Sequence, residues 1–175
     1  MGLREQLLPE HAVLHDVEGF WIILNEAQTQ GSIKVLDIGR KGYANLCFWN
    51  ESLGTGGVVI AVNTDVAVVD MVGVSLEERK AVMSLILSDP TDYHVQAEVR
   101  KTSGSAPVDF MVLDGLCDYE TIKGDFEMYQ TLVRPGGKIA LGNANDPQIL
   151  KFWEEIPYQK KNYYADGAGV GIVGL

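Results

Sequence analysis

The chain is poor in cysteine and in basic residues, and each shortage excludes a class of protein. The two cysteines, Cys47 and Cys117, lie far apart without metal-site spacing, so neither a disulfide framework nor a zinc cluster is expected. Lysine and arginine number 14 against 24 acidic residues, which gives a formal net charge of −10. This excess of acids disfavours binding to nucleic acid or to an anionic membrane. We expect a cytoplasmic protein whose partner is a small molecule, a sugar or another protein.

Long apolar runs are also lacking. The longest candidate for a membrane span, GGVVIAVNTDVAVVDMVGVSL, is interrupted by Asp65 and Asp70, which are costly at the centre of a bilayer. The first residues, MGLREQLLPEH, carry charges among their leucines, so we expect no signal peptide. We find no repeat, low-complexity run or flexible linker, and the 175 residues fit a single domain over 1–175.

Hydrophobic periodicity in the first third of the chain predicts a helix followed by a β-α-β unit. Apolar residues spaced by three and four predict a helix over 11–30. The short apolar runs at 33–39 and 58–63 predict two strands, and the segment 45–53 between them has a helical pattern. A first helix therefore precedes the first strand.

The middle of the chain suggests a shortened fold. Ser75 and Glu78 form a capping-box pattern, which predicts a helix that ends at 89–90, and the alternating segment 93–99 predicts a third strand. Only about eight residues then precede the next apolar run, too few for a helix. We therefore expect either an opened pocket on this side or a second subunit covering it, as in a homo-oligomer.

The last third of the chain returns to alternating strands and helices. The predicted elements are a buried strand at 108–115, a helix at 119–133 broken by RPGG, a strand at 138–143, a helix at 147–156, and two short strands at 162–165 and 170–175. Strands separated by helices predict an α/β, Rossmann-like fold with a mainly parallel sheet and helices on both faces. The core spans 33–156, and the C-terminal strands within 158–175 form an antiparallel edge.

Polar residues collect where each predicted strand ends. In such sheets, ligands bind at the carboxyl ends of the strands, at the point where the strand order reverses. The candidates are Asp37, Gly39, Arg40, Lys41, Gly42, residues 63–65, Glu98, residues 114–119 and residues 142–146. The loop DIGRKG lacks the G-x-G-x-x-G spacing of dinucleotide-binding proteins, and Asn63 stands in place of their acid, so an NAD-binding oxidoreductase is a remote alternative.

Three segments taken together are far more specific than any one of them. VLDIG…GY, then VIAVN, then VDFMVLDGLCDYETIKGDFEMYQTLVRPGGKIAL resemble, in this order, the class I S-adenosylmethionine-dependent methyltransferases. The branch they most resemble is the small sugar- and antibiotic-tailoring one, related to cephalosporin-hydroxylase-type proteins and catechol O-methyltransferases. The likeness covers about residues 33–156. It implies a transferase that uses S-adenosylmethionine to methylate a small molecule or a sugar.

The resemblance also implies roles for individual residues around the cofactor. Asp37 would hold the amino end of the methionine moiety, while Gly39 and Gly42, on either side of Arg40 and Lys41, would let the backbone approach. Asn63, beside Thr64, would accept from the ribose hydroxyls, and Glu98 would lie near the adenine. Asp114 matches a magnesium ligand of metal-dependent members, and Asn143 is the second metal candidate. From the residues alone, Asp37 and Asp114 could instead cap the helices that follow.

Departures from the family pattern leave a second hypothesis open. Cys117 stands where this branch usually has histidine, although Tyr119 is retained, so no catalytic base is assigned. Arg40 and Lys41 place long side chains in the cofactor loop. The alternative is a methyltransferase-fold protein without catalysis that serves as a binding or interaction module.

Overall fold

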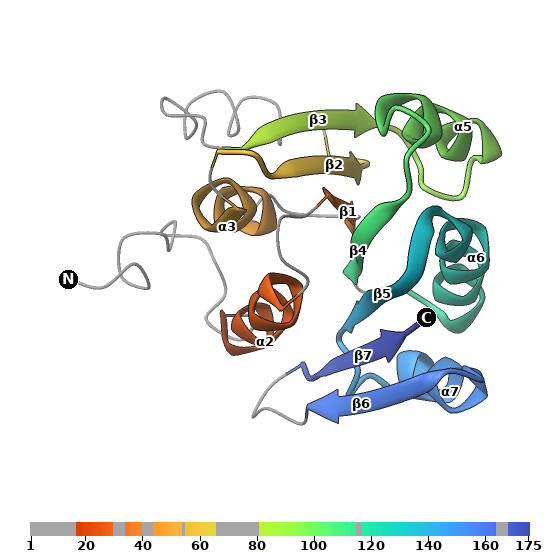
Figure 1. Ribbon diagram of the computed structural model, residues 1–175. Coiled ribbons are helices and arrows are strands. Elements are labelled where there is room, and N and C mark those ends of the chain that lie inside the picture. The colour runs from red at the N-terminus through yellow and green to blue at the C-terminus, as the bar shows by residue number, and fades with distance from the viewer. Residues whose placement is uncertain are drawn as a thin grey trace.

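The computed structural model describes residues 17–29, 34–39, 44–53, 55–65, 81–114, 117–163 and 168–175. They form a seven-stranded sheet in the order β3-β2-β1-β4-β5-β7-β6 (Figure 1). The strands are β1 Lys34–Gly39, β2 Val58–Asn63, β3 Val82–Leu87, β4 Val108–Asp114, β5 Val133–Gly142, β6 Gln159–Tyr163 and β7 Val170–Gly174. The helices are α2 Val17–Gln28, α3 Ala44–Leu53, α5 Tyr93–Thr102, α6 Tyr119–Tyr129, the 3₁₀ turn η2 Gln130–Leu132, and α7 Pro147–Glu155.

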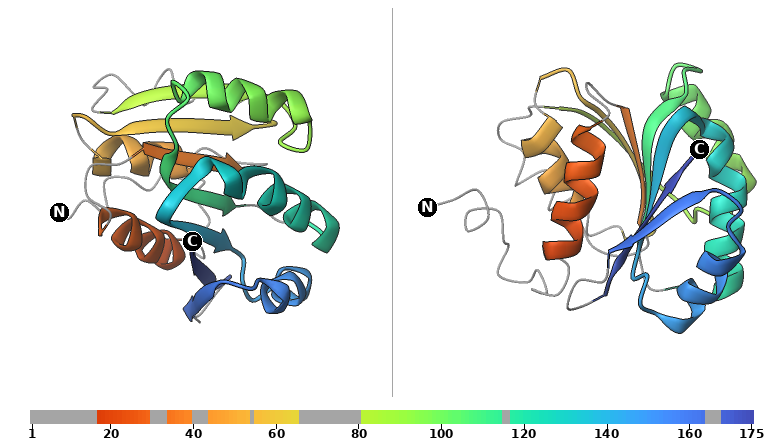
Figure 2. Two further views of the ribbon diagram at one scale, coloured as in Figure 1. Left: turned by 45° about the vertical axis from the view of Figure 1, so that its right-hand side comes forward. Right: turned by 60° about the horizontal axis from the view of Figure 1, so that its bottom comes forward.

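The α/β fold predicted from the sequence is confirmed. β1 to β5 pair in parallel, whereas β7 runs antiparallel to both β5 and β6. Figure 2 shows α2 and α3 on one face of the sheet and α5, α6 and α7 on the other. Among the described residues, no helix is long and apolar enough to cross a membrane.

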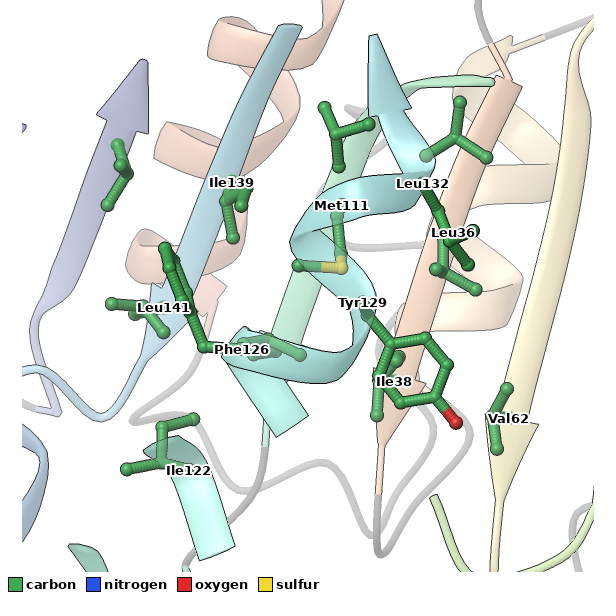
Figure 3. Close-up of a cluster of buried hydrophobic side chains, with 14 of the residues drawn as sticks. Leu36, Ile38, Val62, Met111, Ile122, Phe126, Tyr129, Leu132, Ile139 and Leu141 are labelled. Atoms are coloured by element: carbon green, nitrogen blue, oxygen red, sulfur yellow. The ribbon is translucent and has the colours of Figure 1, made fainter. Parts of the chain in front are cut away.

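Both faces of the central strands are buried, which explains why these strands are continuous apolar runs rather than alternating ones. On one face, Ile122, Phe126 and Tyr129 of α6 pack against side chains of β1, β4 and β5 (Figure 3). The hydroxyl of Tyr129 is buried and donates to the carbonyl of Pro90 at 2.8 Å, so even this polar tip is satisfied. On the other face, Trp49 of α3 packs within a second core.

The expected third strand is wrong. Residues 93–102 form helix α5, which begins after the N-cap Asp92 and buries Val95 and Val99, one turn apart. The third strand is instead β3, Val82–Leu87, which lies in the segment predicted as a helix and pairs in parallel with β2. The run VMSLIL is six residues long and uncharged. A short apolar run of this kind fits a strand or a buried helix equally well by periodicity.

The fold is therefore not shortened. α5 is the helix between β3 and β4 that the sequence analysis did not find. The argument for an opened pocket on that side therefore no longer holds. The argument for a second subunit that covers this side rested on the same missing helix. Glu98 lies on α5 and is exposed, so it does not follow a strand as the sequence predicted.

Other boundaries differ less. α2 lies within the helix predicted over 11–30, of which residues 11–16 and 30 are outside the described part. The capping box at Ser75 and Glu78 is also outside it. The segment RPGG does not separate a helix from a strand, because it lies inside β5 as an irregularity in the pairing with β4.

Glu26 fastens α2 to the sheet. One carboxylate oxygen accepts from Lys138 Nζ of β5 at 2.7 Å, and the other accepts from the Tyr163 hydroxyl of β6 at 2.6 Å. The hydrogen bond from Lys138 has the larger effect, and together with that from Tyr163 it holds the pKa of Glu26 below its usual value of 4.5. Only 22% of the side chain is exposed, so the interaction is partly shielded from water.

Replacing Gly171 by alanine should destabilise the fold. A Cβ atom there would lie 2.5 Å from Cζ3 and 2.8 Å from Cε3 of the buried Trp153, which packs from α7 onto β7. The indole is rigid, so the helix or the strand must move. We expect the free energy of unfolding to fall by about 1–3 kcal/mol, measured by urea denaturation.

Gly124→Ala is the matched control for this substitution. Gly124 lies in the interior of α6, and no atom is within 4 Å of the position of its Cβ. Alanine should raise the free energy of unfolding by about 0.5–1 kcal/mol, because glycine loses more backbone entropy on folding. Equal effects of the two substitutions would contradict the packing of Trp153 on β7.

The carboxylate of Glu26 should make stability depend on pH. A carboxyl whose pKa is lowered on folding stabilises the protein fully above its unfolded pKa, and this contribution is lost as the pH falls through the folded pKa. From about pH 6 to about pH 3, the wild type should lose about 1–2 kcal/mol more unfolding free energy than Glu26→Gln. Urea denaturation over this range measures the difference, and the exposed Glu154→Gln serves as control. Parallel profiles for Glu26→Gln and the wild type would contradict the prediction.

Candidate functional site

The candidate site lies at the carboxyl edge of the sheet, between β1 and β4. From β1 the chain proceeds to β2 and β3 on one side, and then returns to β4 on the other side of β1. The strand order therefore reverses between β1 and β4, and Gly39 and Asp114 are register partners at that point. A crevice for a ligand is expected at this place in a parallel sheet.

Asp37 is buried inside β1, below this edge. Its Oδ2 accepts from the indole Nε1 of Trp49 at 2.6 Å, and Trp49 is itself fully buried in α3. The bond joins the first strand to the helix that follows it. This contact is made to a side chain in the middle of α3 rather than to the backbone at its first turn.

Asn63 ends β2 and lies beside Gly39. A Cβ on Gly39 would be 3.4 Å from Asn63 Nδ2 and 3.7 Å from Asp37 Oδ1, so the structure brings these three residues together. The side-chain carbonyl of Asn63 accepts from the backbone amide of Asp65 at 2.8 Å. The oxygen that was expected to accept from a ribose therefore already shapes the turn after β2. Thr64 in this turn is exposed, and Asp65 is half-buried.

Asp89 occupies the place after the third strand that the sequence analysis assigned to Glu98. Its Oδ1 accepts from the amide of Thr91 at 2.9 Å and from the hydroxyl of Thr91 at 2.8 Å. Ser88, the residue before it, donates its amide to the carbonyl of Asn63 at 3.0 Å. The turns after β2 and β3 are thus joined. The signal for Asp89 was present as Asp-Pro directly after an apolar run, but we interpreted it as the end of a helix.

Asp114 and Asn143 meet at the ends of β4 and β5. Asn143 Nδ2 donates to Asp114 Oδ1 at 3.4 Å, and a Cβ on Gly142 would collide with the same oxygen. Asn143 has a φ of 56°, a conformation that asparagine tolerates better than most residues. The two predicted metal candidates are therefore neighbours, and Gly142 leaves room for the Asp114 carboxylate.

This pair offers a magnesium ion one carboxylate. Magnesium prefers oxygen ligands, and protein sites usually supply carboxylates for it. Here one carboxylate faces an amide nitrogen, and among the described residues no three His, Cys, Asp or Glu side chains are grouped to hold a metal ion. We therefore derive no step that depends on a metal.

Tyr119 links two helices. Its hydroxyl donates to the carboxylate of Glu155 on α7, 2.7 and 2.8 Å from the two oxygens, and accepts from Lys123 Nζ at 3.0 Å. The hydrogen bond with Tyr119, followed by that with Glu155, raises the pKa of Lys123. The hydrogen bond with Tyr119 also lowers the pKa of the Glu155 carboxyl. Cys117 nearby is a half-buried thiol. Asp118 caps α6 by accepting from the amide of Thr121 at 2.8 Å, so Asp114 is not the cap.

Residues 40–43, between β1 and α3, lie outside the described part of the chain. They include Arg40, Lys41 and Gly42, which were predicted to contact the cofactor. Of the other predicted cofactor contacts, Asp37, Gly39, Asn63, Thr64 and Asp114 lie in or beside the ends of β1, β2 and β4, whereas Glu98 does not.

Replacing Trp49 by phenylalanine tests the bond to Asp37. The change removes the indole N–H that the buried carboxylate accepts, so we expect a loss of about 1.5–3 kcal/mol in unfolding free energy beyond the packing effect. Trp153→Phe is the matched control, since the indole N–H of Trp153 makes no hydrogen bond to the described residues. Urea denaturation measures both. A Trp49→Phe loss no larger than that of Trp153→Phe would show that the bond is weak.

Solved structures match this fold, although no protein-family model and no curated protein sequence matches the chain. The O-methyltransferase TomG from Streptomyces achromogenes, in complex with SAM, has a TM-score of 0.69 at 16% identity, over 98% of this chain and 85% of its own. Cofactor-bound Rv0187 from MTB has a TM-score of 0.68 at 17% identity, over 98% and 85%. MycE, a methyltransferase of the mycinamycin biosynthetic pathway in complex with Mg and SAH, has a TM-score of 0.65 at 15% identity, over 98% and 52%.

At these identities, the matches establish the fold. The chain has the fold of the class I S-adenosylmethionine-dependent O-methyltransferases, with a mostly parallel seven-stranded sheet and an antiparallel β5-β7-β6 edge. They do not distinguish the sugar- and antibiotic-tailoring branch that the sequence resembles.

Proposed function

We propose that this protein is an S-adenosylmethionine-dependent methyltransferase that acts on a small molecule or a sugar. One observation carries the proposal: Gly39 and Asp114 lie side by side where the strand order reverses, and Asn63 adjoins Gly39. This is the place where a parallel α/β sheet binds a ligand. The fold is shared with proteins solved in complex with SAM or SAH.

The residues at this edge suit a ligand that carries hydroxyl groups and positive charge. Gly39 has no side chain, so a ligand can approach the end of β1 closely. Asp65 and Asp89 follow β2 and β3, and Asp114 ends β4; their carboxylates would accept from ribose hydroxyls or from the amino group of the cofactor. Asn63 would act indirectly, by holding the turn that carries Asp65.

Little further chemistry is asked of the protein. The cofactor, when bound, supplies a methyl group on a positively charged sulfur, which is already a strong electrophile. The protein must orient the acceptor in line with that methyl group and exclude water. No described residue is assigned as a base. An acceptor that loses its proton readily, or one that is a nitrogen, therefore fits this site best.

A second candidate function is binding without catalysis. Two observations favour it: the side-chain oxygen of Asn63 is engaged by the Asp65 amide, and Cys117 stands where the related branch has histidine. A protein of this kind would retain the fold and bind the cofactor or another small molecule at the same edge. It would not transfer a methyl group.

Calorimetric titration with S-adenosylmethionine and S-adenosylhomocysteine tests the proposal. We expect both to bind, and we expect Gly39→Val to weaken both by roughly tenfold or more, because its side chain would fill the approach to β1. Gly124→Ala, on the exposed face of α6, is the control and should bind as the wild type does.

Three results would decide against the proposal. Failure of both ligands to bind at millimolar concentration would contradict a cofactor site. Binding of NAD in their place would favour the oxidoreductase alternative. Binding of both without release of S-adenosylhomocysteine from S-adenosylmethionine, across a panel of phenols, amines and sugars, would favour the non-catalytic candidate.

A further inference from the structure

A hollow of about 310 Å³ lies at the amino end of β4, far from the candidate site. We call it the amino-edge hollow, and the residues that define it are Val99, Arg100, Ser103, Ser105, Val108, Thr131 and Leu132. Val108 is the first residue of β4, whereas Asp114, at the candidate site, is the last. A strand of this length spans about 20 Å, so the hollow and the candidate site are separate.

The amino-edge hollow has an apolar floor and a polar rim. Its floor is formed by buried side chains from α5, β4 and η2: Val99, Val108 and Leu132. Its rim carries the hydroxyl groups of Ser103, Ser105 and Thr131 and the guanidinium of Arg100. A pocket with an apolar body and a few grouped polar atoms is the usual form of a small-molecule site.

Arg100 is held at this rim. Its Nη2 donates to the hydroxyl of Thr131 at 3.2 Å, which joins the last turn of α5 to η2. None of the described carboxylates lies within ion-pair distance, 4.0 Å, of the guanidinium. The positive charge is therefore available to a ligand that enters the hollow.

The end of α5 has little negative charge left to repel an anion. Unpaired carbonyls at a helix C-terminus normally favour cations. Here the carbonyls of Val99, Arg100 and Lys101 accept from the amides of Ser103, Ser105 and Gly104, respectively, at 2.8 to 3.0 Å. The chain can fold back in this way because Gly104 and Ser105 adopt positive φ angles of 66° and 61°.

Basic groups are in excess around the hollow, although the whole chain is acidic. Lys34 Nζ donates to the carbonyl of Ser103 at 2.7 Å. Both carboxylate oxygens of Asp109, the residue after Val108, are engaged: one by Arg134 Nε at 2.6 Å and the other by the Lys34 amide at 2.7 Å. The acid of this region is thus neutralised, while Arg100 is not.

We propose that the amino-edge hollow binds a small carboxylate with a short hydrocarbon body. The planar guanidinium of Arg100 matches a carboxylate in charge and geometry, and the Ser105 hydroxyl can donate to it as well. The hydroxyls of Ser103 and Thr131 donate to the carbonyls of Arg100 and Met128 instead. The apolar floor takes the hydrocarbon. At roughly 30 Å³ per water-sized group, the volume admits about ten non-hydrogen atoms.

Titration of the isotope-labelled full chain with sodium hexanoate, followed by amide NMR shifts, tests the proposal. Hexanol supplies the hydrocarbon without the charge, and inorganic phosphate supplies charge without the hydrocarbon. We expect hexanoate to shift the amides of 103–106, 108 and 131–132 and to bind roughly tenfold tighter than either comparison probe. Equal binding of hexanol or of phosphate, or shifts spread over the surface, would overturn the proposal.

Substitutions at the rim sharpen the test. Arg100→Gln should weaken hexanoate binding by roughly tenfold or more and leave hexanol unchanged, because only the charged contact is lost. Thr131→Val keeps the shape of the hollow and should weaken hexanoate less. Lys151→Gln, on the exposed surface of α7, removes the same charge elsewhere and should have no effect. Unchanged hexanoate binding by Arg100→Gln would overturn the proposal, independently of any cofactor result at Gly39.

Discussion

The parallel pairing of β1 with β4 is the contact on which the rest of the structure depends. It joins the first strand of the chain to one that begins about 70 residues later, and it aligns Val35 with Phe110 and Gly39 with Asp114. Because β2 and β3 lie on one side of β1 and β5 on the other, this pairing creates the reversal of strand order. The candidate site is therefore a consequence of topology: the two strand ends must meet there whatever the surrounding loops do.

How much of this fold could be predicted depended on how long and how apolar each segment is. β2 and β4 were predicted correctly because they are buried on both faces and therefore appear as unbroken apolar runs. β3 and α5 were exchanged, because β3 is a half-exposed edge strand and α5 buries only Val95 and Val99. Their identity is decided by pairing with β2 and by packing against α6, which local periodicity does not contain.

The candidate site, too, could be predicted from the sequence only in part. Gly39, Asn63, Asp114 and Asn143 could be placed from the sequence because each ends or follows a strand that was predicted correctly. Their hydrogen bonds could not, since the contact of Asn63 with Asp65 and that of Asp114 with Asn143 depend on side-chain orientation within folded turns. Glu98 was misplaced only because its element was misassigned, and Asp89 was missed for the same reason.

The two ends of the parallel strands differ in charge, and this difference separates their possible ligands. Asp65, Asp89 and Asp114 collect at the carboxyl edge, which favours a ligand that carries positive charge, as a sulfonium does. At the amino edge, Arg134 neutralises Asp109, which also accepts from the backbone amide of Lys34, and the guanidinium of Arg100 has no described carboxylate beside it. In a chain with a net charge of −10, the described strand ends thus carry three acids at one edge of the sheet and an arginine at the other. A carboxylate drawn to Arg100 would be repelled by the acids at the edge where Gly39 lies, so we expect the two proposed sites to select chemically different molecules.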